Sequence, residues 1–220
     1  MADEPKTNIS DMLAVHGAFR TTLPGAARLV AAVDEGDTDR AILLANFYEN
    51  ILDFLHAHHS GEDEIIWPRL LERCPDEAGE VRRIADQHDD VTELTARARA
   101  ELSSWSGSAS ASLGAELVAT LDALDGSLQP HFAEEEAVIL PLRATYMSPD
   151  EWAELPAHGF SHFAGDKPWL ILGLILDQLP EEPRQQMLAH MPPPAQEMWA
   201  GFGHAAYVGL MADVHGRDQG

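Results

Sequence analysis

An internal repeat of histidine, glutamate and proline constrains this chain more than any other feature. Residues 58–68 and residues 131–141 both follow the pattern His-x3-Glu-x5-Pro. On an α-helix, residues four positions apart lie on the same face, about 6 Å from each other. Each copy can therefore direct one imidazole and one carboxylate at a common point, which is the arrangement that metal ligands require.

The repeat also discriminates between two candidate pairs in its first copy. His58 with Glu62 and His59 with Asp63 are both four positions apart. Only the first pair keeps the distance to the following proline that the second copy shows. His56 and His59 are therefore predicted to be solvated or to support the ligands from outside the ligand set. The predicted ligand pairs are His58 with Glu62 and His131 with Glu135.

The hydrophobic pattern predicts an all-α protein. Apolar residues recur at helical spacing in four long segments, over residues 9–33, 39–72, 77–105 and 113–146. No segment shows the alternation of a strand, and the serine-rich stretch 103–112 is predicted to be a flexible loop. The pattern indicates an up-down-up-down four-helix bundle over residues 8–146. Residues 147–220 are predicted to form a short-helix C-terminal extension packed on the bundle, with helices near 152–163, 168–179 and 196–212.

The other two bundle helices each place one histidine on their apolar face. His16 follows Met12 on the first helix, and His88 lies between Ile84 and Val91 on the third. A single such histidine is more often a core residue hydrogen-bonded to backbone. Here two ligand pairs already point inward, and buried imidazoles and carboxylates without partners cost several kcal/mol. A shared metal satisfies all of them, so the predicted ligands are His16, His58, Glu62, His88, His131 and Glu135.

Charge and cysteine content exclude several classes of function. The 220 residues contain 37 acidic and 14 basic side chains, a formal charge of −23, which disfavours nucleic acid and anionic membranes as partners. Residues 1–6 lack a basic start followed by an apolar segment, so no secretory signal is predicted and the expected location is cytoplasmic. The single Cys74 argues against a structural zinc site or an iron–sulfur cluster.

In their helix order, the six predicted ligands resemble those of the hemerythrin-like HHE cation-binding domains. The resemblance covers residues 8–146, and the extension is similar to tails on actinobacterial members, for which it implies no role. It implies a left-handed four-helix bundle with a non-haem di-iron centre, whose two iron ions share an oxo or hydroxo bridge. It also implies that Glu62 and Glu135 bridge the irons, and that dioxygen or a related small ligand binds there.

One position departs from the oxygen-carrying hemerythrins. These have a second histidine four residues after the ligand of the third helix, where this chain has Thr92. Two octahedral irons offer about twelve coordination positions, of which two carboxylates, a solvent-derived bridge and four histidines fill about ten. About two positions would remain, and a more open site favours activation of peroxide or oxygen over reversible carriage.

Three functions stay open at this point. The first is binding or sensing of a small gaseous or peroxide ligand, and the second is an enzyme with peroxide-decomposing or oxidase activity. The third is an interaction module that the metal only stabilises, with an unidentified protein partner. Outside the repeat, His158 and His162 are also four positions apart, but no pair of the same kind faces them. They are interpreted as surface or packing residues.

Overall fold

The computed structural model describes residues 9–216, and within that range it contains helices and no strand. The first part of the chain forms α1 (Ser10–Thr22), α2 (Ala26–Ala31), α3 (Thr38–Gly61), η1 (Glu62–Ile66), α4 (Trp67–Arg73), η2 (Pro75–Glu77), α5 (Ala78–Ala85), α6 (Gln87–Ser106), α7 (Ala111–Glu134), η3 (Glu135–Ile139) and α8 (Leu140–Tyr146). The second part forms α9 (Pro149–Trp152), α10 (Glu154–His162), α11 (Pro168–Asp177), α12 (Glu181–His190), α13 (Pro193–Met198), η4 (Trp199–Gly203) and α14 (His204–His215).

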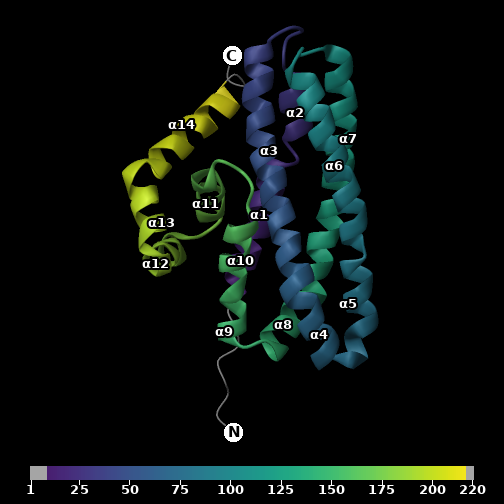
Figure 1. Cartoon of the computed structure of the whole chain (residues 1–220), viewed down its shortest axis with the longest axis vertical. Helices are drawn as coiled ribbons and strands as arrows, with labels where there is room; N and C mark the ends of the chain where they lie inside the picture. The colour runs from purple at the N-terminus through teal and green to yellow at the C-terminus, as the bar shows by residue number, and fades with distance from the viewer. Residues whose placement is uncertain (1–8, 217–220) are drawn as a thin grey trace.

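The first part is a four-helix bundle in which successive helices run in opposite directions (Figure 1). One side of the bundle consists of α1 continued by α2, the next of α3 continued by α4, the third of α5 continued by α6, and the last of α7 continued by α8. The predicted all-α, up-down-up-down architecture is therefore confirmed.

The boundaries differ from the sequence prediction in three places. Pro24 and Gly25 interrupt the first predicted helix, so α1 and α2 are separate. The predicted loop over 103–112 is shorter, because α6 continues to bury Trp105 and α7 begins at Ala111. Finally, α12 was not predicted at all; its residues are mostly polar and none of them is buried, so it lacks the apolar face that periodicity detects.

Both copies of the sequence repeat contain a short π-helical segment. Glu62 begins η1 and Glu135 begins η3, and in each case the backbone N–H five residues later bonds to the glutamate carbonyl. Pro68 and Pro141 lie in the first turn of the following helices. A proline has no N–H and clashes with the carbonyl four residues before it, so regular α-helical bonding cannot pass through these positions. The repeat in sequence is thus also a repeat in backbone geometry.

The two repeat copies pass between two buried apolar clusters. The main core includes Phe19, Leu55 and Phe132, whereas a smaller cluster toward the other end includes Ile66 and Ile139. Along each repeat-bearing helix, the chain therefore passes from one apolar cluster, through the histidine and glutamate, into the second cluster. The polar side chains of the repeat lie in a buried layer between them.

The extension packs along the bundle beside α1 and α3 (Figure 1). Arg40 of α3 donates hydrogen bonds to the carbonyls of Asp213 and Val214 at the end of α14. Asn50 of α3 accepts a bond from the N–H of Lys167, just before α11. These bonds attach the extension to α3 just before α11 and again at the end of α14.

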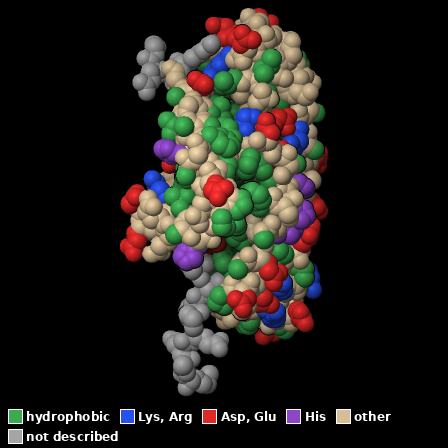
Figure 2. All heavy atoms as spheres, turned by 60° about the vertical axis from the view of Figure 1, so that its left-hand side comes forward, with side chains coloured by type: hydrophobic (Ala, Val, Ile, Leu, Met, Phe, Trp, Pro, Cys, Tyr) green, Lys and Arg blue, Asp and Glu red, His purple; other side chains and the backbone are tan. Residues whose placement is uncertain are grey.

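Apolar side chains gather on the face that the extension presents (Figure 2). No helix within residues 9–216 combines the length and the apolar character needed to cross a membrane. The segment on which the expectation about a secretory signal depends, residues 1–6, lies outside the described residues.

Candidate metal centre

Seven side chains from the four sides of the bundle converge on the buried polar layer. They form two groups whose ligand atoms lie within 4.8 Å of one another, His16, His58, Glu62 and Glu135 in one, and His59, Glu62, His88 and His131 in the other. All six ligands predicted from the sequence are thus brought together. The seventh member, His59, was not predicted as a ligand.

The converging atoms are buried and lack hydrogen-bond partners within the described residues. This holds for the Nε2 atoms of all five histidines, for Oε2 of Glu62 and for both carboxylate oxygens of Glu135. An unpaired buried polar atom normally costs about 1–3 kcal/mol, so seven side chains in this state need a common partner. Imidazole nitrogens and carboxylate oxygens are donors to transition metals, and two cations satisfy both groups. The residues therefore fit a metal pair.

Both glutamates lie between the two groups. Glu62 Oε2 is 3.8 Å from His58 Nε2 in one group and 3.5 Å from His88 Nε2 in the other. Glu135 Oε2 is 3.3 Å from His16 Nε2 and 3.6 Å from His131 Nε2, which again belong to different groups. Each carboxylate thus reaches one histidine of each group. This is the arrangement in which a carboxylate can bridge two cations.

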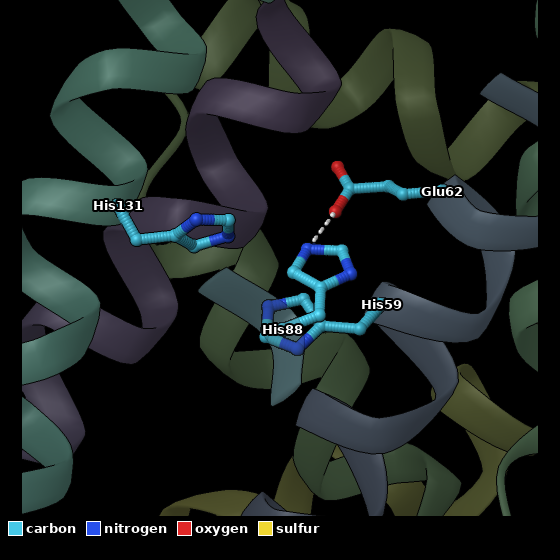
Figure 3. A group of neighbouring side chains, drawn as sticks. All are labelled: His59, Glu62, His88 and His131. Carbon is cyan, nitrogen blue, oxygen red and sulfur yellow. Dashed lines mark ion pairs between the residues drawn. The ribbon is translucent and has the colours of Figure 1, made fainter. Parts of the chain in front are cut away.

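The structure shows that His59 is not solvated, which was one of the two roles predicted for it, and places it among the converging side chains. The His59 side chain is buried, and its ring stacks on that of His88 with centroids 4.0 Å apart (Figure 3). Thr92 occupies the position at which oxygen-carrying hemerythrins have a second histidine on the third helix. Its side chain is exposed. The fifth imidazole therefore comes from α3. Its signal in the sequence was the three-residue spacing to Glu62, which also places two side chains on one helix face.

Three of the histidines are held by hydrogen bonds at their other ring nitrogen. The Nδ1–H groups of His16, His88 and His131 donate to side-chain oxygens of Glu136, Asp63 and Gln87, at 2.9, 2.8 and 2.9 Å. A proton on Nδ1 leaves the Nε2 lone pair free to coordinate, so these bonds select the tautomer that binds metal.

Asp63 therefore orients His88 and does not pair with His59, its alternative partner in the sequence. It also accepts a hydrogen bond from the indole N–H of Trp67 at 3.0 Å. Gln87 is held in turn, because its amide donates to Glu134 at 2.8 Å. The orientation of the imidazoles thus depends on a second set of polar side chains around them.

Burial keeps several of the imidazoles neutral. It lowers the pKa of His58 and His59 well below the usual value, and lowers the pKa of His131 to about 4. Burial would also lower the pKa of His16, but the adjacent Glu135 and Glu136 outweigh it and raise that pKa. Neutral imidazoles are the form that coordinates metal.

The two glutamates are affected in opposite directions. Burial, together with the charge of Glu135, raises the pKa of Glu62 well above its usual value. Burial also opposes ionisation of Glu135, but the surrounding imidazoles, His16 first, hold its pKa far below the usual range. Before a cation binds, the pair therefore shares one negative charge between two carboxyls.

A buried arginine faces the glutamates. The Arg143 side chain is fully buried, and none of its guanidinium nitrogens has a hydrogen-bond partner within residues 9–216. Burial lowers its pKa to about 10, against the attraction of Glu62 and Glu135. Arg143 remains charged at neutral pH and offsets the negative charge of these two carboxyls.

Comparison with known proteins agrees with this geometry. A family model of the hemerythrin HHE cation binding domain matches residues 7–143, which include all seven converging side chains. No curated protein and no solved structure matches the chain. The family match covers more than half of the 220 residues. This protein therefore belongs to the hemerythrin HHE cation-binding domain family.

Proposed function

We propose that this protein holds two iron ions between the five histidines and two glutamates of the buried layer, and binds a small ligand such as dioxygen, nitric oxide or peroxide at them. The proposal rests on the position of Glu62 and Glu135. Each carboxylate lies within 4 Å of one histidine from the first ligand group and of another histidine from the second. Two shared carboxylates are what a pair of cations requires, whereas a single cation would leave one group of donors without a partner.

The ligand types alone do not distinguish iron from other metals, and the preference for iron comes from the family. Imidazole and carboxylate suit iron, manganese and zinc alike. The one cysteine takes no part, because Cys74 lies in the smaller apolar cluster and its thiol donates to the carbonyl of Leu70 at 2.9 Å. The resemblance to hemerythrin-like domains favours iron. As a separate point, a single cysteine suits a protein of the reducing cytoplasm. A bound iron pair supplies a redox-active centre at which a small ligand can coordinate.

The position of His59 favours ligand binding over more demanding chemistry. With five histidines in place of four, two octahedral ions would retain about one open position between them. One open position would be enough for a gas molecule or peroxide to bind. Chemistry that needs a ligand and a co-substrate on neighbouring positions is disfavoured. With His59 among the ligands, the site would be less open than the four predicted histidines indicate, which makes oxygen activation less favoured.

The aromatic side chains above the centre exclude water from it. The Phe132 ring stacks on the His16 ring with centroids 4.5 Å apart, and Phe19 packs against both Phe132 and His58. In such an environment, electrostatic interactions between ligand and protein are stronger than in water. The hydrogen bond from His16 Nδ1 to Glu136 holds the imidazole toward the centre.

The test is metal analysis and absorption spectroscopy of the protein purified from iron-supplied cells. We expect near two irons per chain and a charge-transfer band that changes reversibly when dioxygen or nitric oxide is added and removed. His58→Ala and His131→Ala should lose iron, whereas the exposed His190→Ala should retain it. Steady evolution of oxygen from peroxide, lost in His131→Ala, would instead establish a peroxide-decomposing enzyme. A full iron complement in both ligand variants would refute the site.

A further inference from the structure

A second histidine pair lies outside the buried centre, at the contact between the extension and the bundle. His158 and His162 are four residues apart on α10, and Glu64 of η1 approaches them from the bundle. Their ligand atoms lie within 4.8 Å of one another. We propose that these three side chains form a separate site for a divalent transition-metal ion of the zinc type, which fastens α10 to the bundle.

The two imidazoles are arranged as a chelating pair. Their rings stack with centroids 3.8 Å apart and an angle of 13° between the planes, so the two rings lie nearly parallel and in contact. The Nδ1–H of His162 donates to the His158 carbonyl at 3.0 Å. This bond leaves the Nε2 atom of His162 as its free donor, as the Nδ1 bonds do for the histidines of the buried centre.

Glu64 provides the third donor from a distant part of the sequence. Its Oε2 lies 3.0 Å from Nε2 of His158, while Nδ1 of His158 is buried and has no hydrogen-bond partner within the described residues. The sequence offered no partner for the histidine pair because Glu64 is 94 residues away. The approach of α10 to Gly61, whose missing Cβ would lie 3.5 Å from His158 Nδ1, brings the three together.

The site is distinct from the buried centre although it is close in sequence. Glu62 and Glu64 both belong to η1, but the Glu62 side chain is 1% exposed whereas that of Glu64 is 59% exposed. The two carboxylates therefore serve opposite faces of the same π-helical segment. A cation on the outer face would link the extension to the segment that supplies a bridging carboxylate.

The donor set defines the class of cation. Two imidazoles and one carboxylate, with a fourth position open to solvent, match the ligands of an open zinc site and suit nickel, copper or cobalt as well. Calcium and magnesium prefer sites made of oxygen atoms alone and are disfavoured. Zn²⁺ is therefore the appropriate probe.

The experiment is a Zn²⁺ titration of the iron-loaded, full-length protein, followed by calorimetry and by metal analysis. We expect one Zn²⁺ per chain to bind while the iron content stays constant, and the melting temperature to rise. His162→Ala should weaken Zn²⁺ binding at least about tenfold, because even residues that only orient a metal ligand contribute that much. Since His162 is exposed, this variant should fold normally, which circular dichroism checks.

The matched control is His190→Ala, an exposed histidine at the end of another helix of the extension. It should bind Zn²⁺ as the unmodified protein does. Glu64→Gln should weaken binding as His162→Ala does. If no Zn²⁺ binds beyond the buried centre, the three residues form only a hydrogen-bonded and stacked contact and the proposal is wrong. Equal Zn²⁺ affinity in His162→Ala and the unmodified protein would overturn it as well.

Discussion

The guanidinium carbon of Arg143 lies 3.6 Å from the centre of the Trp152 ring, so an aromatic side chain of the extension covers the charge that faces Glu62 and Glu135. The Trp152 indole N–H donates in turn to Asp11 of α1 at 2.8 Å. A cation–π contact between an aromatic ring and a desolvated guanidinium stabilises the folded protein by about 2 kcal/mol. The extension therefore takes part in the electrostatics of the metal centre.

Arg143→Leu should destabilise the metal-free protein by about 3 kcal/mol, because the buried carboxyls of Glu62 and Glu135 then lack a compensating charge. The loss should be smaller in the metal-loaded protein, where cations neutralise the same carboxyls. Urea unfolding of both forms measures the difference. Arg69→Leu is the control, since Arg69 makes partly exposed ion pairs with Glu151 and Glu154 and should cost at most about 1 kcal/mol. Equal losses in the two forms would contradict the assigned role of Arg143.

His59→Ala should lower metal affinity by at least about tenfold, whereas loss of a solvated histidine, one of the two roles predicted from the sequence, would leave the affinity unchanged. Removal of the imidazole leaves the group that contains His88 and His131 one donor short. His56→Ala, three residues earlier on the same helix, should have no effect because its side chain is exposed. The metal content of each variant after dialysis against a weak chelator tests both expectations. Retention of the full metal content by His59→Ala would show that His59 is not a ligand.

Gln87→Leu should weaken metal binding about 10–100-fold without removing any ligand, since the Nδ1–H of His131 then loses its acceptor. The tautomer and orientation of His131 would no longer be selected. Gln129→Leu serves as the control, because the Gln129 amide donates to Asp125 on the same helix and makes no hydrogen bond to the histidines of the centre within residues 9–216. An unchanged dissociation rate of the metal in Gln87→Leu would exclude this orienting role.

The metal-free protein should respond to acid through His131. Burial disfavours the charged form of this imidazole and lowers its pKa from the ordinary 6.5 to about 4 in the folded protein. Between pH 4 and pH 6.5, His131 is therefore protonated in the unfolded chain but neutral in the folded protein. Relative to metal-free His131→Gln, the unmodified protein should lose up to about 3 kcal/mol of stability as the pH falls from 6.5 to 4. Urea unfolding at several pH values tests this, and parallel pH profiles would contradict it.

The sequence predicted those parts of the site that the two repeat copies share. His58 corresponds to His131 and Glu62 to Glu135, so the comparison of the copies located both pairs. It could not locate His59, since Phe132 occupies the corresponding position of the second copy and stacks on His16 instead of providing a donor. Arg143 was not predicted for the same reason. The corresponding position after the first repeat copy is the buried Leu70, so comparison of the copies gave no signal there.

Contacts that join distant segments were also beyond the sequence. The hydrogen bond between His131 and Gln87, and the approach of Glu64 to His158, depend on how helices pack and leave no periodic signal. The helical bundle itself was predictable, because long amphipathic segments with short connections have few other ways to bury their apolar faces.

The buried apolar clusters on either side of the polar layer affect which molecules can reach it. A molecule that moves along the bundle axis must cross hydrocarbon side chains, around Phe19 and Phe132 from one direction and around Ile66 and Ile139 from the other. A nonpolar gas dissolves in such a medium and can diffuse through it as side chains fluctuate. A strongly hydrated molecule would have to shed its water first, so this path along the bundle axis would be easier for a nonpolar gas than for peroxide.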